Sequence, residues 1–138
     1  MAVELIQIPG ITNQHQTRWL VRVLQINGHD LVLGSLADWA RNSSGDYKKI
    51  MKVLQMIGQV DRIRDEKHVK KSDNPKHDKV YEIRAHKGSA RLMFFYSEKN
   101  RSVVICTNSY WKAKDSKKEQ DQAFETCHKL KQIYEDQS

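Results

Sequence analysis

The sequence predicts an α+β protein, because the spacing of its apolar residues changes from the helical period to the strand period along the chain. Residues 17–26 form a β-branched and aromatic run, helical spacing occupies residues 33–58, and strand-like alternation occupies residues 80–108. An amphipathic segment follows from Ser116. We therefore expect an N-terminal strand and a helical hairpin packed on a twisted antiparallel sheet, followed by a C-terminal helix.

The first strand is expected at residues 17–26, where the run ends at Asn27-Gly28. Residues 1–16 contain Pro9-Gly10 and a polar run, so they are expected to form an arm of uncertain order, and residues 17–138 a single domain.

Two helices should follow the first strand. In residues 33–42, Ser35 followed by Asp38 predicts the helix start, and the apolar face is Leu33, Leu36, Ala37 and Ala40. Residues 43–46 open a second helix that Gly58 closes, with an apolar face of Ile50, Val53, Leu54 and Ile57. These helices should pair as a hairpin.

Residues 61–79 mix seven basic and five acidic side chains with Asn74-Pro75 and have no apolar period, which predicts a surface loop. The strands at 80–86, 90–96 and 102–108 are separated by short turns and should form an antiparallel meander. In the last helix, Ser116 and Glu119 form a capping box, and Ala123, Cys127, Leu130 and Tyr134 keep one apolar face.

Several classes of protein are disfavoured. No apolar run has the length or flanks of a signal peptide or a transmembrane helix, so a cytoplasmic protein is expected. Cys106 and Cys127 lack metal or redox spacing and should be buried thiols. The six histidines are scattered, so neither a metal nor another cofactor is predicted.

Positive charge is concentrated in one segment. Residues 84–118 carry nine Lys or Arg against two acids, a net charge of +7 that equals the formal charge of the whole chain. Clustered cations raise the local potential and attract phosphate, which points to a polyanion-binding site. A solvated charged face is the alternative for any single lysine.

Two arginines are expected to face each other. A two-residue Lys87-Gly88 turn would place Arg84 opposite Arg91 on one face of the sheet. Such a pair needs an anionic ligand or a nearby carboxylate such as Glu82, unless both arginines lie over an apolar sheet. On the first reading, removal of either arginine should leave thermal stability unchanged or slightly raised.

Basic and aromatic residues interleave at positions 108–114, just before the last helix. Helix amides with Lys112 and Lys114 nearby can hold phosphate, and an aromatic ring can stack on an unpaired base. Trp111 is expected to close the core under the helix, which leaves Tyr110 as the candidate for a polar role.

Three motifs carry a family resemblance. Residues 79–84 (KVYEIR), 90–96 (ARLMFFY) and 114–119 (KDSKKE) with Ala123 resemble, in order and nearly in spacing, the RelE/HigB superfamily of type II toxin–antitoxin toxins, most of all its phage-derived HigB-like branch. The resemblance covers about residues 33–136. Asp115-Ser116 stands where that branch has Thr-Pro.

The resemblance implies a RelE-like microRNase fold and a toxin that cleaves mRNA on the ribosome without a metal, neutralised by a HigA-like helix-turn-helix antitoxin. It implies that Arg84 and Arg91 clamp the scissile phosphate, that Lys112 or Lys114 assists or acts as the base, and that Tyr110 or His86 positions RNA or donates a proton. RNA-binding roles would fall to the remaining cations of the segment: Lys87, Arg101, Lys117 and Lys118. A ParE-like gyrase-inhibiting toxin and a non-catalytic RNA-binding regulatory module are the alternatives.

Overall fold

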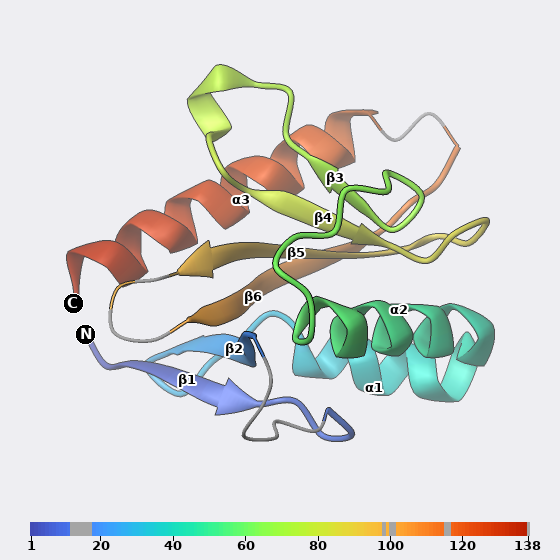
Figure 1. Cartoon of the computed structure of the whole chain (residues 1–138), viewed down its shortest axis with the longest axis horizontal. Coiled ribbons are helices and arrows are strands. Elements are labelled where there is room, and N and C mark those ends of the chain that lie inside the picture. The colour runs from blue at the N-terminus through green and yellow to red at the C-terminus, as the bar shows by residue number, and fades with distance from the viewer. Residues whose placement is uncertain (12–17, 98, 100–101, 115–116, 138) are drawn as a thin grey trace.

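The structure, a computed structural model, describes residues 1–11, 18–97, 99, 102–114 and 117–137. Its framework is a six-stranded sheet with helices on both faces (Figure 1). The elements follow one another as β1 (Val3–Gln7), β2 (Leu20–Ile26), α1 (Leu33–Asn42), α2 (Ser44–Ile57), β3 (Val69–Lys71), the 3₁₀ helix η1 (Pro75–His77), β4 (Tyr81–Arg84), β5 (Ala90–Ser97), β6 (Val103–Trp111) and α3 (Lys117–Asp136). The expected α+β class is confirmed.

The sheet order is β1-β2-β6-β5-β4-β3, and its centre is the expected meander of β4, β5 and β6. The expectation of a purely antiparallel sheet is wrong, because β2 pairs with β6 in parallel from Leu20↔Val103 to Val23↔Cys106. The helical hairpin between β2 and the meander makes this parallel pairing possible, since a parallel pair needs a long crossover connection. The sheet is therefore mixed.

Two segments contain structure that the sequence pattern did not predict. The expected N-terminal arm contains β1, which pairs antiparallel with β2, while residues 12–16 of that arm lie outside the described part. The expected loop at 61–79 contains β3, which pairs with β4 from Val69↔Ile83 to Lys71↔Tyr81, and η1. Both strands lie at the edges of the sheet and are short, so their side-chain patterns are weak.

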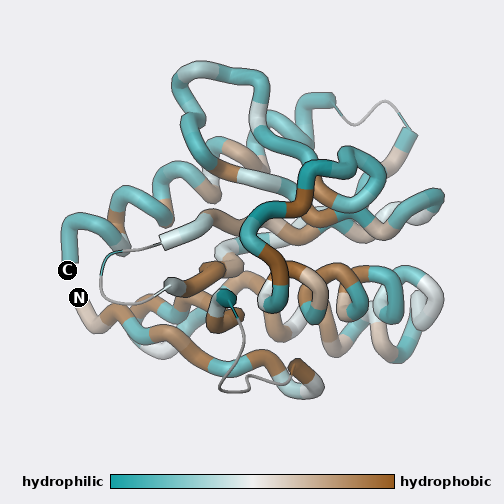
Figure 2. Tube along the Cα trace, viewed as in Figure 1, coloured by the Kyte–Doolittle hydropathy of each residue, from teal (hydrophilic) through white to brown (hydrophobic). Residues whose placement is uncertain are grey.

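The sheet separates two hydrophobic clusters. One cluster joins α1, α2 and one sheet face and includes Trp19, Ile50 and Phe94. The other joins α3 to the opposite face and includes Phe95 and Phe124. Figure 2 shows the hydrophobic residues gathered in the central strands and the inner sides of the helices, with the β3–η1 region hydrophilic. Cys106 and Cys127 are both buried and free, as expected.

Helix boundaries are mostly as predicted, with a different start for α1. Asp30 Oδ1 accepts hydrogen bonds from the amides of Val32 (2.8 Å) and Leu33 (2.7 Å), so Asp30 opens this helix in place of the predicted Ser35 and Asp38. The buried residues of α1 are Leu36 and Trp39, whereas Ala37 and Ala40 are exposed. Helix α2 begins at Ser44 and ends before Gly58, as predicted. Ser116, half of the predicted α3 capping box, lies outside the described residues.

Candidate anion-binding site

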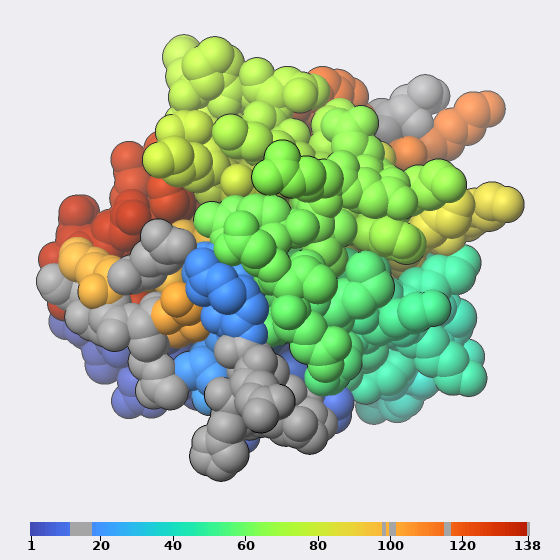
Figure 3. Space-filling model, viewed as in Figure 1, coloured from blue at the N-terminus to red at the C-terminus, as the bar shows by residue number. Residues whose placement is uncertain are grey.

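A cationic pocket of about 330 Å³ lies beside the β4–β5 hairpin. Its residues come from the loop before β3, from the hairpin and from the segment after β6. Figure 3 shows the hairpin tip (yellow) projecting from the molecule beside the start of α2 (blue-green). The pocket is lined by Glu66, Lys67, Arg84, Ala85, His86, Lys87, Arg91 and Lys112. Five Lys or Arg side chains therefore share this pocket with one carboxylate.

The hairpin register brings the two arginines together as predicted, with Arg84 paired to Arg91. The turn itself differs from the predicted two-residue Lys87-Gly88 turn. Residues 85–89 connect β4 to β5, the amide of Gly88 donates to the carbonyl oxygen of Ala85 (2.7 Å), and Lys87 has a φ of 63°. The register survives because Arg84 and Arg91 are still equally far along the chain from the centre of the predicted Lys87-Gly88 turn.

Arg84 forms an ion pair with Glu82, which lies outside the pocket. Its Nε donates to Oε2 of Glu82 at 2.9 Å, and its Nη1 donates to the carbonyl oxygen of Glu66 at 3.3 Å. The Arg84 side chain keeps 26% of its surface exposed, whereas that of Glu82 is fully buried. The nearby carboxylate left open by the sequence is thus Glu82.

Glu82 has two further donors. The hydroxyl of Tyr110 donates to Oε1, and Nε2 of Gln120 donates to Oε2 at 3.2 Å. Burial, followed by the hydrogen bond and the charge of Glu82, raises the pKa of the Tyr110 phenol. Tyr110 is the cross-strand partner of Arg91 and shares Glu82 with Arg84, but it does not line the cationic pocket.

Arg91 is the most buried cation of the site, with only 5% of its surface exposed. Its Nη1 donates to the carbonyl oxygens of Gly88 (3.0 Å) and Ala90 (2.9 Å). Its Nε is buried and has no hydrogen-bond partner among the described residues. Burial lowers the pKa of Arg91, and Glu82 partly opposes that shift. A buried donor without a partner is costly, and an anion in the pocket would relieve that cost.

His86 lies on the hairpin tip with several cations around it. Loss of solvent, followed by the charges of Lys87 and Lys67 and smaller effects of His68 and Lys49, lowers the pKa of His86 below 6.5. The ring of His68 lies 6.4 Å away in an edge-on arrangement. At neutral pH the imidazole is therefore mostly neutral and can accept a proton.

Two side chains of α2 bind the backbone of the β4–β5 hairpin. Oδ2 of Asp46 accepts the amides of Ser89 (2.6 Å) and Ala90 (2.8 Å), and Nζ of Lys49 donates to the carbonyl oxygen of His86 (2.7 Å). Gly88 packs closely here, since a Cβ atom on it would lie 2.6 Å from Oδ1 of Asp46.

The other predicted site residues are dispersed. Lys87 and Lys112 line the pocket, whereas Lys114 does not. Lys117 pairs with Asp121 on α3 (3.0 Å), and Lys118 lines a separate cavity of about 690 Å³. Arg101 lies outside the described residues.

The expected place of Trp111 under α3 is wrong. Trp111 is 47% exposed, and its ring lies 6.5 Å from that of Trp39 on α1. The strand β6 continues to Trp111, which directs this side chain to the α1 face of the sheet, opposite the face that α3 covers.

Sequence reasoning missed the residues that reach the pocket from elsewhere in the chain. Glu66 and Lys67, from the segment assigned as a loop, line the pocket, and Asp46 and Lys49, from α2, bind the backbone of the hairpin beside it. Their only sequence signal is charge, which 41 Lys, Arg, Asp and Glu residues of the chain share.

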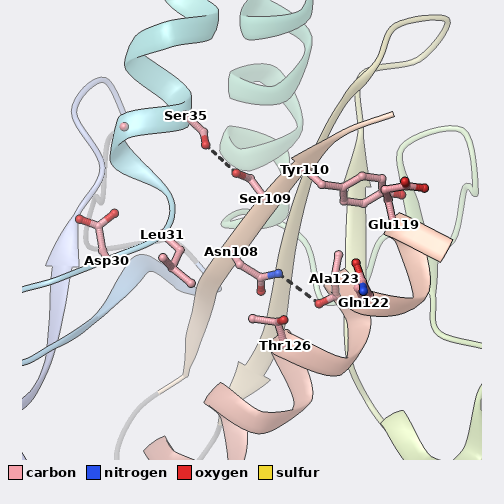
Figure 4. A pocket seen from close by; sticks show the side chains of 11 residues that line it. Asp30, Leu31, Ser35, Asn108, Ser109, Tyr110, Glu119, Gln122, Ala123 and Thr126 are labelled. Carbon is pink, nitrogen blue, oxygen red and sulfur yellow. Dashed lines mark hydrogen bonds between the residues drawn. The ribbon is translucent and has the colours of Figure 1, made fainter. Parts of the chain in front are cut away.

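A larger cavity of about 670 Å³ lies between β6, the start of α1 and α3 (Figure 4). Tyr110 lines this cavity, and Ser35 and Ser109 join their hydroxyls beside it at 2.7 Å. Its charged lining residues are Asp30 and Glu119, both acidic, so this cavity does not suit a phosphate.

No group of three possible metal ligands occurs among the described residues, and none of the described helices is long and apolar enough to cross a membrane.

Fold and site together define an α+β protein with a mixed six-stranded sheet and a cation-lined pocket beside one hairpin. Residues 37–132 match the model of the family described as Phage derived protein Gp49-like (DUF891). The chain belongs to this family, a toxin-like family related to RelE and HigB. Searches of curated proteins and of solved structures found no match. The narrower assignment to a HigB-like branch stays a prediction.

Proposed function

We propose that this protein is the toxin of a type II toxin–antitoxin system and that it cleaves mRNA on the ribosome. The observation that carries the proposal is Arg91, whose buried guanidinium has an unpartnered Nε in a pocket with four other cations. A phosphodiester would supply an acceptor oxygen for this Nε and negative charge for the cations around it. Membership of a toxin-like family supports the biological role.

In the proposed reaction, the 2′-oxygen of a ribose attacks the adjacent phosphorus atom. His86 accepts the 2′-hydroxyl proton, since its lowered pKa keeps it mostly neutral. Arg84 and Arg91 stabilise the charge on the phosphorane. The bond from phosphorus to the 5′-oxygen breaks, and Lys112 gives that oxygen a proton. The products are a 2′,3′-cyclic phosphate and a 5′-hydroxyl, and the residues themselves perform every proton transfer.

The experiment is brief expression in growing bacteria, with transcripts mapped at nucleotide resolution. We expect growth arrest and cuts within reading frames, and we expect both to disappear in Arg91→Ala. Lys129→Ala is the matched control, because it removes one exposed cation of α3 that pairs with Glu125 far from the pocket. Cuts that persist when the start codon is deleted would contradict ribosome dependence.

The same experiment separates the alternative classes. A gyrase-inhibiting toxin would arrest growth with DNA damage signalling and intact mRNA. A non-catalytic RNA-binding module would leave mRNA uncut while it still bound RNA.

The proposed partner is an antitoxin, expected to be a small HigA-like helix-turn-helix protein encoded beside this chain. Co-expression with the neighbouring reading frames should restore growth and yield a complex. If neither neighbour binds, the toxin–antitoxin assignment fails, whereas mRNA cleavage can still stand.

A further inference from the structure

We propose that Glu82 is a positioning residue, which fixes the guanidinium of Arg84 for catalysis while Tyr110 holds Glu82 in place. This inference rests on the proposed mRNA cleavage, and it gives Tyr110 a supporting role instead of a catalytic one. Neither Glu82 nor Tyr110 lines the pocket, so neither touches the substrate.

The geometry around Glu82 favours one orientation of Arg84. Nε of Arg84 is used by Glu82 at 2.9 Å, and one Nη1 hydrogen bond goes to the carbonyl oxygen of Glu66 at 3.3 Å. A planar guanidinium held at these two nitrogens has no free rotation about its long axis. Its remaining donors are left for the pocket, which Arg84 lines.

Tyr110 and Gln120 hold the carboxylate from two further elements. Tyr110 belongs to β6 and Gln120 to α3, whereas Glu82 and Arg84 belong to β4. The Tyr110 hydroxyl donates its proton to Oε1 of Glu82, and burial with this hydrogen bond raises the phenol pKa. A hydroxyl with its proton committed in this way cannot also serve the leaving group.

Removal of the Glu82 charge should affect phosphate binding and catalysis in opposite directions, and this difference provides the test. In Glu82→Gln the pocket loses a negative neighbour, so phosphate should bind as well as before or more tightly. Arg84 loses its ionic anchor, however, and catalysis depends on orientation more steeply than binding does. We therefore expect kcat to fall about 10- to 100-fold with unchanged or stronger phosphate binding.

Two further variants should lower kcat by smaller amounts, and a third is a control. Tyr110→Phe keeps the Glu82–Arg84 pair and should lower kcat only about 3- to 10-fold, whereas loss of a general acid would cost about 100-fold or more. Gln120→Ala removes the longest of the contacts and should stay within about 2-fold of wild type. Glu125→Gln is the matched control, since it removes an exposed carboxylate of α3 that is paired only with Lys129 in the described ion pairs.

Two measurements decide the matter on the full chain. Steady-state cleavage of ribosome-bound mRNA gives kcat, and titration with inorganic phosphate, followed by the NMR signals of the arginine Nε–H groups, gives phosphate binding and the order of the Arg84 side chain. In Glu82→Gln the Arg84 signal should broaden or move. Thermal unfolding shows that each variant is measured in its folded state.

The combination of phosphate binding and mRNA cleavage distinguishes failure of the proposed function from failure of the positioning role. If wild type neither binds phosphate nor cleaves mRNA, the proposed function fails. If wild type does both and Glu82→Gln equals it, Glu82 does not position Arg84. If Glu82→Gln weakens phosphate binding in proportion to cleavage, Glu82 only supports the fold, and a 100-fold loss in Tyr110→Phe would return Tyr110 to a catalytic role.

Discussion

Replacing Arg84 by alanine should destabilise the protein, although two opposed arginines alone suggest the reverse. Glu82 is fully buried, and Arg84 is its ion-pair partner at 2.9 Å. In Arg84→Ala the carboxylate keeps, among the residues that the structure describes, the neutral donors Tyr110 and Gln120. A buried charge that loses its counter-ion costs more than the relief of repulsion between two arginines returns.

The magnitude follows from burial. Removing one partner of a buried ion pair costs about 3–5 kcal/mol. Because 26% of the Arg84 side chain is exposed, we expect a smaller loss of about 2–3 kcal/mol in the free energy of unfolding. For a chain of this length, about 3–4 °C accompanies each kcal/mol, so the melting temperature should fall by about 6–12 °C.

Urea and thermal unfolding followed by circular dichroism test this prediction. The double variant Glu82→Gln/Arg84→Ala should regain about 1–2 kcal/mol relative to Arg84→Ala, because no charge is then left buried without a partner. Lys129→Ala, which breaks an exposed pair, should change stability by less than about 1 kcal/mol. An unchanged melting temperature in Arg84→Ala, with no gain in the double variant, would refute the reasoning.

Three further predictions concern the hairpin and its neighbours. Gly88→Ala should lower the free energy of unfolding by about 1–3 kcal/mol, because the new Cβ displaces the Asp46 carboxylate from the amides of Ser89 and Ala90. Gly45→Ala is the control for urea unfolding, and it should be neutral or stabilising because its Cβ meets no described atom within 4 Å. The cleavage rate should rise with pH through an apparent pKa below 6.5 and then level off, and in His86→Ala this rise should be absent. A rise with its midpoint at or above pH 6.5 would exclude His86 as the base. Alkaline titration of tyrosinate absorbance should show one tyrosine that ionises at higher pH than the others, and Tyr110→Phe should remove this ionisation. The raised phenol pKa stabilises the fold fully below pH 10.0, and this stabilisation is lost at higher pH. The same titration curve in wild type and Tyr110→Phe would contradict the Tyr110–Glu82 bond.

Local patterns predicted the parts of the fold that local interactions determine. The helical hairpin follows from the period of Ile50, Val53, Leu54 and Ile57, all of which are buried. The pairing of Arg84 with Arg91 follows from the short connection between two strands, and it survives a different turn because the centre of the hairpin is unchanged.

Long-range pairing explains what the sequence did not reveal. The strand β1 is five residues long, and within the described part of the chain it pairs with β2 alone. Lys67 reaches the pocket because β3 pairs with β4, and nothing in a mixed-charge segment signals that pairing. Trp111 was misplaced because β6 runs three residues beyond Asn108, which puts its ring on the opposite side of the sheet from α3.

The placement of the carboxylates explains how so many cations can share one small pocket. Glu82 stands behind Arg84, and Asp46 stands behind the hairpin, where it binds the amides of Ser89 and Ala90. Both carboxylates favour the charged form of Arg91, yet neither lines the pocket. Glu66 lines the pocket and would repel phosphate, whereas the two carboxylates outside the pocket offset the repulsion between the cations and leave their outward donors free. The acids that stabilise the hairpin are therefore also what allows its cations to stay available to an anion.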